Sequence, residues 1–104
     1  RFERLWPALK QPWYFLHPSA VTIDHNGYVY VADTDNHRIQ KLTENGQLIT
    51  EWGKKGEEEN EFNRPTGLAS DVNGFIYVVD ANNHRIQKFN GDGLFLQQWG
   101  GQGS

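Results

Sequence analysis

The sequence contains no cysteine, so it forms neither a disulfide nor a thiolate metal site, and the redox state of its compartment stays open. It has no run of 18 apolar residues, which excludes a transmembrane helix. No stretch combines helical periodicity with capping residues, which argues against an α-helical fold. The chain begins at Arg1 without an initiator methionine or an apolar signal segment, and we therefore expect a fragment or a processed chain.

An excess of basic residues is also missing. Thirteen acidic residues stand against ten basic ones, which gives a formal net charge of -3. A basic face is the usual electrostatic footprint of nucleic-acid binding, so we do not expect nucleic acid as a partner. Four acidic residues cluster in one stretch, which the charge pattern predicts to be a solvated connection. They are Glu57, Glu58, Glu59 and Glu61.

Repetition is the main positive feature of the sequence. The stretch Asp33–Lys41 recurs as Asp80–Lys88, with seven of nine positions identical and every pair 47 residues apart. The same offset aligns residues 18–57 with residues 65–104 without an insertion. We therefore divide the chain into residues 1–17, the tail of a preceding unit with its connection, followed by repeats at 18–64 and 65–104.

Each repeat is predicted to contain four short strands. Asn-Gly pairs follow the first strand of both repeats, and such pairs are strong hairpin signals. The second strand is apolar on both alternating sets of residues, which indicates that both of its faces are covered. The predicted strands are Ala20–Ile23, Tyr28–Asp33, Arg38–Leu42 and Leu48–Trp52, then Gly67–Ser70, Phe75–Asp80, Arg85–Phe89 and Phe95–Trp99.

Four antiparallel strands in each 47-residue unit, apolar on both sides, are typical of β-propeller blades stacked face to face. A flat sandwich is the alternative, but a strict period with a proline at the start of each repeat favours radial repetition. The fold class predicted is all-β, with two blades of four antiparallel strands. Two blades leave two outer faces uncovered, so we expect further blades or copies of the chain to complete the stack.

The residues of the two units resemble the NHL repeat. The pattern Pro-x-Gly, Asp-x-x-Gly, Tyr-Val-x-Asp, Asn-x-Arg-Ile-Gln-Lys-Phe and Trp-Gly-x-x-Gly runs over Pro65–Gly103 and, with weaker matching, over Pro18–Gly56. The resemblance implies blades of a β-propeller, typically a six-bladed one. Two departures are Ala20, where glycine is expected, and the connection Pro7–His17, which lacks the Gly-x-x-Gly pattern.

The repeated stretch between the second and third strands is interpreted as a structural brace for a hairpin. An Asp and an Arg that flank a tight turn form a charge-assisted bond, and an Asn between them tolerates a left-handed backbone. The next residue, Ile39 or Ile86, is expected to pack inward. A catalytic site needs one constellation rather than one per blade, so no catalytic residue is predicted. The brace residues are Asp33, Asn36, Arg38, Asp80, Asn83 and Arg85.

Two histidines, His37 and His84, occupy equivalent places in the two repeats. A metal site built from them would require convergence across two blades, and no third ligand stands close by, so neither a metal nor another cofactor is predicted. A hydrogen-bonded turn histidine is the simpler interpretation. The aromatic run at 13–15 is either a buried connection or a partner surface. Candidate ligand-binding positions on the rim are His17, Arg64, Trp13, Tyr14, His37 and His84.

The function predicted is that of a non-catalytic propeller scaffold, which binds protein, peptide or glycan ligands through its loop rims. The partners expected are further blades of a longer chain or other copies, three of which would supply six blades. Two alternatives follow from the resemblance: a fragment of a metal-dependent six-bladed lyase or lactonase, or an RNA-binding NHL propeller. The sequence does not indicate a cellular compartment.

Overall fold

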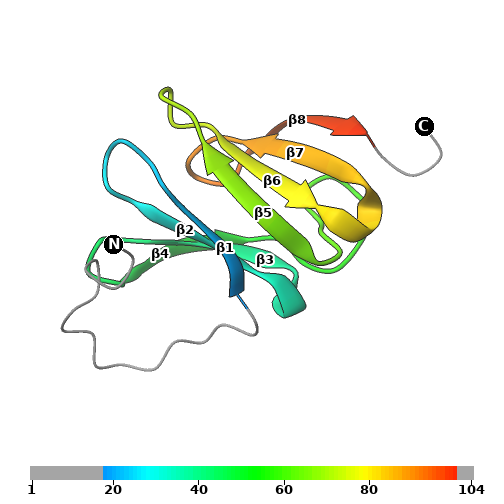
Figure 1. Ribbon diagram of the computed structural model, residues 1–104, viewed down its shortest axis with the longest axis horizontal. Coiled ribbons are helices and arrows are strands. Elements are labelled where there is room, and N and C mark those ends of the chain that lie inside the picture. Colours follow the sequence, from blue (N-terminus) through cyan, green and yellow to red (C-terminus); the bar gives the residue numbers. More distant parts are fainter. Residues whose placement is uncertain (1–17, 101–104) are drawn as a thin grey trace.

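A computed structural model describes residues 18–100, which form two four-stranded antiparallel sheets (Figure 1). Within each sheet every strand pairs with the next one in the sequence, so both sheets are simple meanders. We call the first sheet blade 1 and the second blade 2. Blade 1 contains β1 (Pro18–Ile23), β2 (Val29–Asp33), β3 (Arg38–Leu42) and β4 (Leu48–Trp52). Blade 2 contains β5 (Pro65–Ser70), β6 (Ile76–Asp80), β7 (Arg85–Phe89) and β8 (Phe95–Gly100).

The hairpins form where the sequence predicts them. Asp24 closes the first turn of blade 1, because its Oδ1 accepts hydrogen bonds from the backbone N–H groups of Asn26 and Tyr28. Gly27 then takes a left-handed backbone with φ 89°, a conformation that costs glycine no steric strain. Asp71 repeats the same pair of bonds in blade 2. Single-turn 3₁₀ helices, η1 (Thr34–Asn36) and η2 (Ala81–Asn83), connect the second and third strands.

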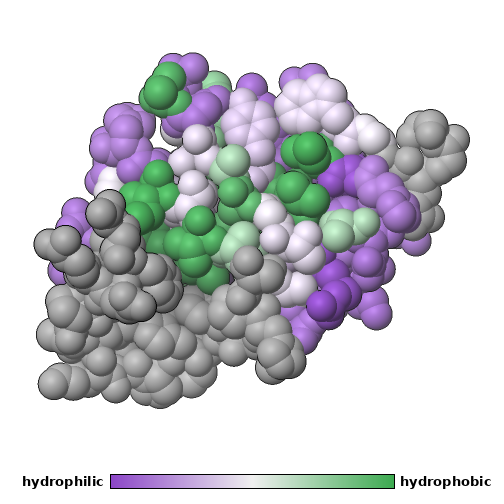
Figure 2. Space-filling view, viewed as in Figure 1, coloured by the Kyte–Doolittle hydropathy of each residue, from purple (hydrophilic) through white to green (hydrophobic). Residues whose placement is uncertain are grey.

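The two blades fan out from their first strands. β1 and β5 lie side by side, and the side-chain oxygens of Thr22 and Ser70 are 3.1 Å apart across them. β4 and β8, the fourth strands, lie far apart on opposite sides of the molecule (Figure 1). Figure 2 shows apolar residues gathered across the middle of the same view, where β1 and β5 run. This radial order, first strand inside and fourth strand outside, is that of propeller blades.

The core lies between the blades. One face of blade 1 packs against the opposite face of blade 2, and aromatic rings fill the centre of the contact. The ring centroid of Phe89 of β7 lies 5.5 Å from that of Trp52 of β4 and 5.7 Å from that of Phe62. The buried cluster consists of Tyr30, Ala32, Ile39 and Trp52 from blade 1 with Phe62, Ile76, Val78 and Phe89.

The two second strands differ in burial, which corrects part of the prediction. β2 is buried along its whole length, as its apolar pattern indicates. β6 is not, because Val79 is 40% exposed. Ile86 of β7, expected to pack inward, is 39% exposed, so that expectation was wrong. The reason is that nothing within residues 18–100 covers this face of blade 2. Among the same residues, no helix is long and apolar enough to cross a membrane.

Candidate functional site at the blade rim

The turns after β2 and β6 bring the conspicuous polar residues to one rim of the blades. In each turn the left-handed residue is the histidine, with φ 54° at His37 and 57° at His84. Asn36, which the sequence predicts to tolerate this conformation, does not adopt it. Asn36 lies in the 3₁₀ turn and donates from Nδ2 to Asp33 Oδ2 at 3.0 Å. Histidine is one of the few side chains that enter the left-handed region with any frequency.

The Asp and Arg that flank each turn are in contact. Arg38 Nε lies 3.0 Å from Asp33 Oδ2, and Arg85 Nε lies 2.8 Å from Asp80 Oδ2. Both carboxylates are fully buried, so each needs its charged partner to offset the loss of hydration. We therefore retain the hairpin-brace interpretation as a proposal for stability measurements to test.

In blade 2 the arginine also organises the acidic connection between the blades. Both Nη atoms of Arg85 donate at 2.8 Å to backbone carbonyls, those of Glu57, Glu58 and Glu61. A further bond to Gln98 engages the last guanidinium N–H. With all five of its N–H groups in use, this arginine has no donor left for a ligand.

Two other side chains of blade 2 hold the same connection by its backbone. Asn83 Nδ2 donates to the carbonyl of Gly56 at 2.8 Å, and Gln87 Nε2 donates to that of Glu61 at 2.8 Å. The carboxylates of Glu57, Glu58 and Glu59 belong to exposed residues. The connection is thus fixed from inside by its carbonyls, while these three glutamates are exposed to solvent.

At the junction of the blades, His37 accepts a hydrogen bond from the residue that precedes blade 2. The backbone N–H of Arg64 donates to His37 Nδ1 at 3.0 Å, and the Arg64 guanidinium pairs with Asp35. Thr34 Oγ1 donates to the carbonyl of Pro65 at 2.9 Å. We call these three contacts, between Thr34, Asp35 and His37 on one side and Arg64 and Pro65 on the other, the rim latch.

The rim latch requires a particular backbone conformation at Arg64 and a neutral imidazole at His37. Arg64 precedes a proline and has φ 61°, a conformation unfavourable for a residue with a side chain, so its neighbours must hold it there. Burial lowers the pKa of His37, and the charge of Lys55 lowers it further. A lowered pKa keeps the imidazole neutral near pH 7, and only a neutral imidazole has an Nδ1 that accepts a hydrogen bond.

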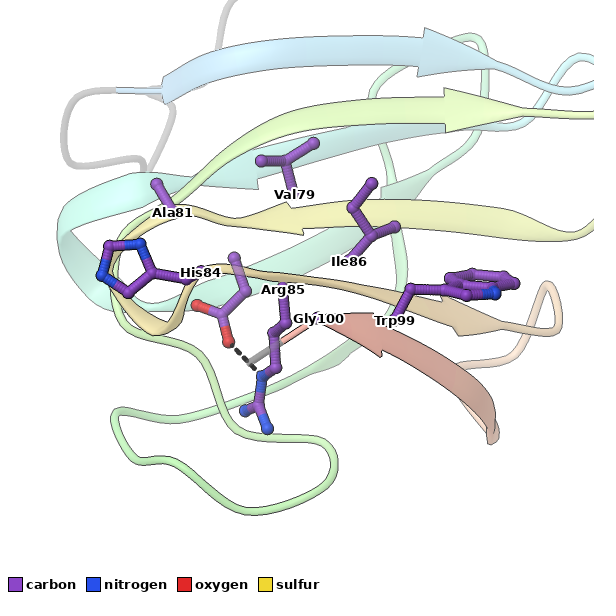
Figure 3. A pocket seen from close by; sticks show the side chains of 8 residues that line it. Val79, Ala81, His84, Arg85, Ile86, Trp99 and Gly100 are labelled. Carbon is purple, nitrogen blue, oxygen red and sulfur yellow. Dashed lines mark hydrogen bonds and ion pairs between the residues drawn. The ribbon is translucent and has the colours of Figure 1, made fainter. Parts of the chain in front are cut away.

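The equivalent residues of blade 2 lie on its uncovered face. His84 is exposed, and within residues 18–100 its ring has no hydrogen-bond partner. A surface hollow begins at His84 and Ala81 and extends along Val79 and Ile86 to Trp99 (Figure 3). Its lining is largely apolar, which suits contact with another protein surface better than a small polar ligand.

A second polar cluster, at the opposite rim, is repeated in both blades. Tyr30 donates from its hydroxyl to Asp24 Oδ2 at 2.9 Å, and Tyr77 does the same to Asp71 at 2.8 Å. Burial and the bond to Asp24 raise the pKa of Tyr30 well above its usual range. Lys41 Nζ lies 4.4 Å from the centre of the Tyr28 ring. Because both blades carry this arrangement, we interpret it as part of the blade rather than as a reactive site.

Of the candidate rim residues, the structure brings two together: His37 and Arg64 meet in the rim latch, whereas His84 stands apart. Sequence reasoning considered His37 and Arg64 separately, and no signal linked two residues 27 positions apart. His17, Trp13 and Tyr14 lie outside the described residues. In the part of the chain that is described, no three His, Asp or Glu side chains gather as metal ligands would.

Comparison with known proteins supports this architecture. The model of the NHL repeat matches residues 15–42 and 62–89, together more than half of the chain. A solved structure from Bacteroides fragilis superposes with a TM-score of 0.70 at 17% identity, over 92% of this chain and 28% of that one. Another, a Bacteroides caccae protein of unknown function, gives 0.55 at 14% identity, over 92% of this chain and 35% of that one. This chain therefore spans only about a third or less of either. No curated protein matches it.

Proposed function

Because the chain belongs to the NHL repeat family, we propose that it is a two-blade segment of a non-catalytic β-propeller scaffold. Such a segment contributes blades to a larger ring, about six in all, and offers its loop rims to protein, peptide or glycan ligands. The similar solved chains are about three times as long as this one, which supports further blades beside these two.

The observation that carries this proposal is the difference between two equivalent faces. In blade 1 the face containing Ile39 and Trp52 is buried against blade 2. In blade 2 the equivalent face, containing Ile86 and Trp99, is exposed to solvent. An apolar sheet face needs a partner, and in repeat proteins the neighbouring repeat supplies it. Blade 2 is therefore prepared to receive another blade.

The lack of catalysis is proposed on the arrangement of the polar groups. The Asp–Arg pairs, the Tyr–Asp pairs and the lysines above aromatic rings occur once in each blade, and their atoms are engaged with one another. Arg85 in particular is saturated by protein acceptors. The uncovered face of blade 2 exposes Val79, Ile86 and Trp99, and exposed apolar patches mark protein contacts.

Sedimentation equilibrium over a range of protein concentrations tests the proposal. Without its further blades, the chain is expected to self-associate through the uncovered face. Ile86→Lys, which places a charge on this face, should give a folded monomer. Val72→Lys is the matched control, because Val72 lies in a distant exposed turn; this variant should associate as the parent does. A folded parent that stays monomeric at every concentration would contradict the proposal.

Thermal melting distinguishes the enzyme alternative. A lyase or lactonase with a central metal ion should gain stability from calcium or zinc and lose it with a chelator. The scaffold proposal expects no change of midpoint with either. A reproducible shift would favour the metal-dependent enzyme.

A further inference from the structure

The rim latch between blades 1 and 2 is one half of a repeated device. We propose that His84 is the acceptor through which blade 2 holds a following blade, by binding the backbone N–H of the residue before that blade's first proline. This inference rests on the proposed scaffold function, because it assumes that another blade docks on blade 2. It adds the polar contact that sets the docking position and the kind of blade that fits.

The geometry of His84 matches that of its counterpart. Both histidines end a 3₁₀ turn in the left-handed conformation, and the backbone N–H of each bonds at 3.1 Å to the residue three positions earlier. Both precede an arginine that pairs with a buried aspartate. His37 accepts from Arg64, whereas the ring of His84 is exposed at the end of the uncovered face (Figure 3). The acceptor is therefore in place and unoccupied within residues 18–100.

The remainder of the rim latch has changed between the blades, and this change restricts the partner. Ala81 stands where Thr34 donates, so the hydroxyl bond to a proline carbonyl is lost. Asn82 stands where Asp35 pairs with Arg64, so the carboxylate is lost as well. The residue before the next blade's proline therefore has no carboxylate to balance a positive charge. A following repeat with an uncharged residue at this position fits better than one with arginine.

The apolar part of the contact sets two further requirements. Gly93 of blade 2 has φ 93° and faces Trp52, and a Cβ atom there would lie 2.7 Å from the indole ring. A blade covering Trp99 needs a glycine in the same place. It also needs apolar side chains where Phe62 and Phe89 stand, because Phe89 packs beside Trp52, Phe62 packs against Phe89, and both are fully buried.

A second copy of this chain is a poorer occupant than a further repeat. The backbone N–H of Arg64, which would bind His84 if blade 2 of a second copy docked, is already bonded to His37 of its own chain. On the reverse face of blade 1, which a head-to-tail copy would offer, Val29, Val31 and Leu42 are buried. Contact between two uncovered faces buries apolar surface but leaves His84 without a donor.

The first experiment tests the latch in the chain as it is. Amide hydrogen exchange of Arg64 is compared between the parent, His37→Gly and His37→Asn. Glycine keeps the left-handed backbone but removes the acceptor, whereas asparagine keeps both, because its Oδ1 lies near the place of Nδ1. We expect Arg64 to exchange about tenfold faster in His37→Gly, in line with the loss of one hydrogen bond, and close to the parent rate in His37→Asn. Equal rates in all three proteins would overturn the latch.

The second experiment supplies the following blade. Residues 54–100 are appended once more after Gly100, with the appended copy of Arg64 replaced by Gln. Protection of the backbone N–H of that glutamine from hydrogen exchange is measured in the extended chain and in its His84→Gly and His84→Asn variants. Burial of the Trp99 indole N–H, assigned by comparison with Trp99→Phe, reports docking of the blade separately.

The outcomes separate the two proposals. We expect Trp99 to become buried in the extended parent chain. The backbone N–H of the introduced glutamine should be protected from exchange in the parent and in His84→Asn, but not in His84→Gly. A buried Trp99 with an amide unaffected by His84→Gly would leave the scaffold standing and overturn the role of His84. A Trp99 that stays exposed would overturn the scaffold proposal itself.

Discussion

The two blades present the same face to different surroundings. Ile39 of blade 1 is 0% exposed, whereas its identical counterpart Ile86 is 39% exposed. Trp52 is 8% exposed and Trp99 43%. The residues and their strand registers are equivalent, so the difference arises entirely from the neighbour. A residue that serves as core in one repeat is therefore an interface residue in the next, and its energetic contribution depends on whether the stack continues.

At the rim, by contrast, the two blades differ in the residues themselves. His37 and His84 are conserved between the repeats, but the Thr and Asp of blade 1 are replaced by Ala81 and Asn82 in blade 2. The apolar face is the same in both blades and sets the same packing requirements, whereas the changed polar rim restricts the neighbour of blade 2 further. Four predictions test this contrast between blades, in order of decreasing effect.

The largest difference is expected between Trp52→Ala and Trp99→Ala. Trp52 packs against Phe89 and Gly93 inside the interface, so its truncation leaves a cavity that costs about 3–5 kcal/mol of unfolding free energy. Trp99 stacks on Tyr77 at the surface, and its truncation should cost about 1 kcal/mol. Urea titrations followed by circular dichroism measure both. Similar losses in the two variants would show that the blade 2 face is covered after all.

The next largest effect is expected at Arg85, whose guanidinium binds the carbonyls of the acidic connection. Arg85→Lys keeps a positive charge near Asp80 but loses the fork that binds the carbonyls of Glu57, Glu58 and Glu61, at a cost of about 2–3 kcal/mol. Amide exchange over residues 54–63 should rise, because these bonds fix the connection. Arg38→Lys is the matched control in blade 1, where the arginine side chain is more exposed, and it should leave exchange in that connection unchanged.

A smaller effect is expected at the position where the NHL pattern has glycine, which is Gly67 in the second repeat and Ala20 in the first. Gly67 faces Val79 across β5 and β6, and a methyl group there would lie 2.9 Å from Val79 Cγ2. In blade 1 the equivalent pair is Ala20 with Ala32, and Ala32 is smaller than its counterpart Val79. It therefore leaves room for the Cβ atom of Ala20. Gly67→Ala should therefore cost about 1–2 kcal/mol, and Val79→Ala should relieve most of that cost. A double-mutant cycle measures the coupling, and strictly additive effects would contradict steric compensation.

The smallest effect is a pH dependence at His37. Because burial and Lys55 lower its pKa in the folded chain, the unfolded chain binds the proton more readily. Its contribution to stability is therefore full above the unfolded pKa of about 6.5 and is lost as the pH falls through the lowered folded value. Asp35 and Asp80 oppose the shift, and Arg64 adds to it. In His37→Asn, the urea midpoint should depend less steeply on pH between neutral and mildly acidic pH than in the parent. An unchanged pH dependence would refute this.

Most of the fold was predictable from the sequence because the relevant signals are local. The third strand of each blade begins and ends where its pattern predicts, at Arg38–Leu42 and Arg85–Phe89. Turn glycines and alternating apolar residues act over a few positions, so one repeat contains them all. Asparagine and histidine both tolerate a left-handed backbone, and this conformation falls on His37 because Asn36 lies within the 3₁₀ turn that His37 ends.

The candidate site was less predictable, because its contacts join residues distant in the sequence. Nothing near Arg85 indicates that carbonyls from 24–28 positions earlier surround it. The bond between the Arg64 amide and His37 likewise depends on how blade 2 is placed on blade 1. A backbone N–H carries no sequence signature, so an acceptor for one cannot be recognised from residue types alone.

The sequence by itself determined the period, the four strands of each blade and the membership of a stacked architecture, since these follow from patterns that each repeat carries whole. The tertiary structure decided which apolar faces are core and which are open, and it decided that His37 accepts a hydrogen bond while the His84 ring has no partner within residues 18–100. The physical reason is that burial is a property of pairs of surfaces. Equivalent residues such as Ile39 and Ile86 acquire different environments only when one blade has a neighbour and the other does not.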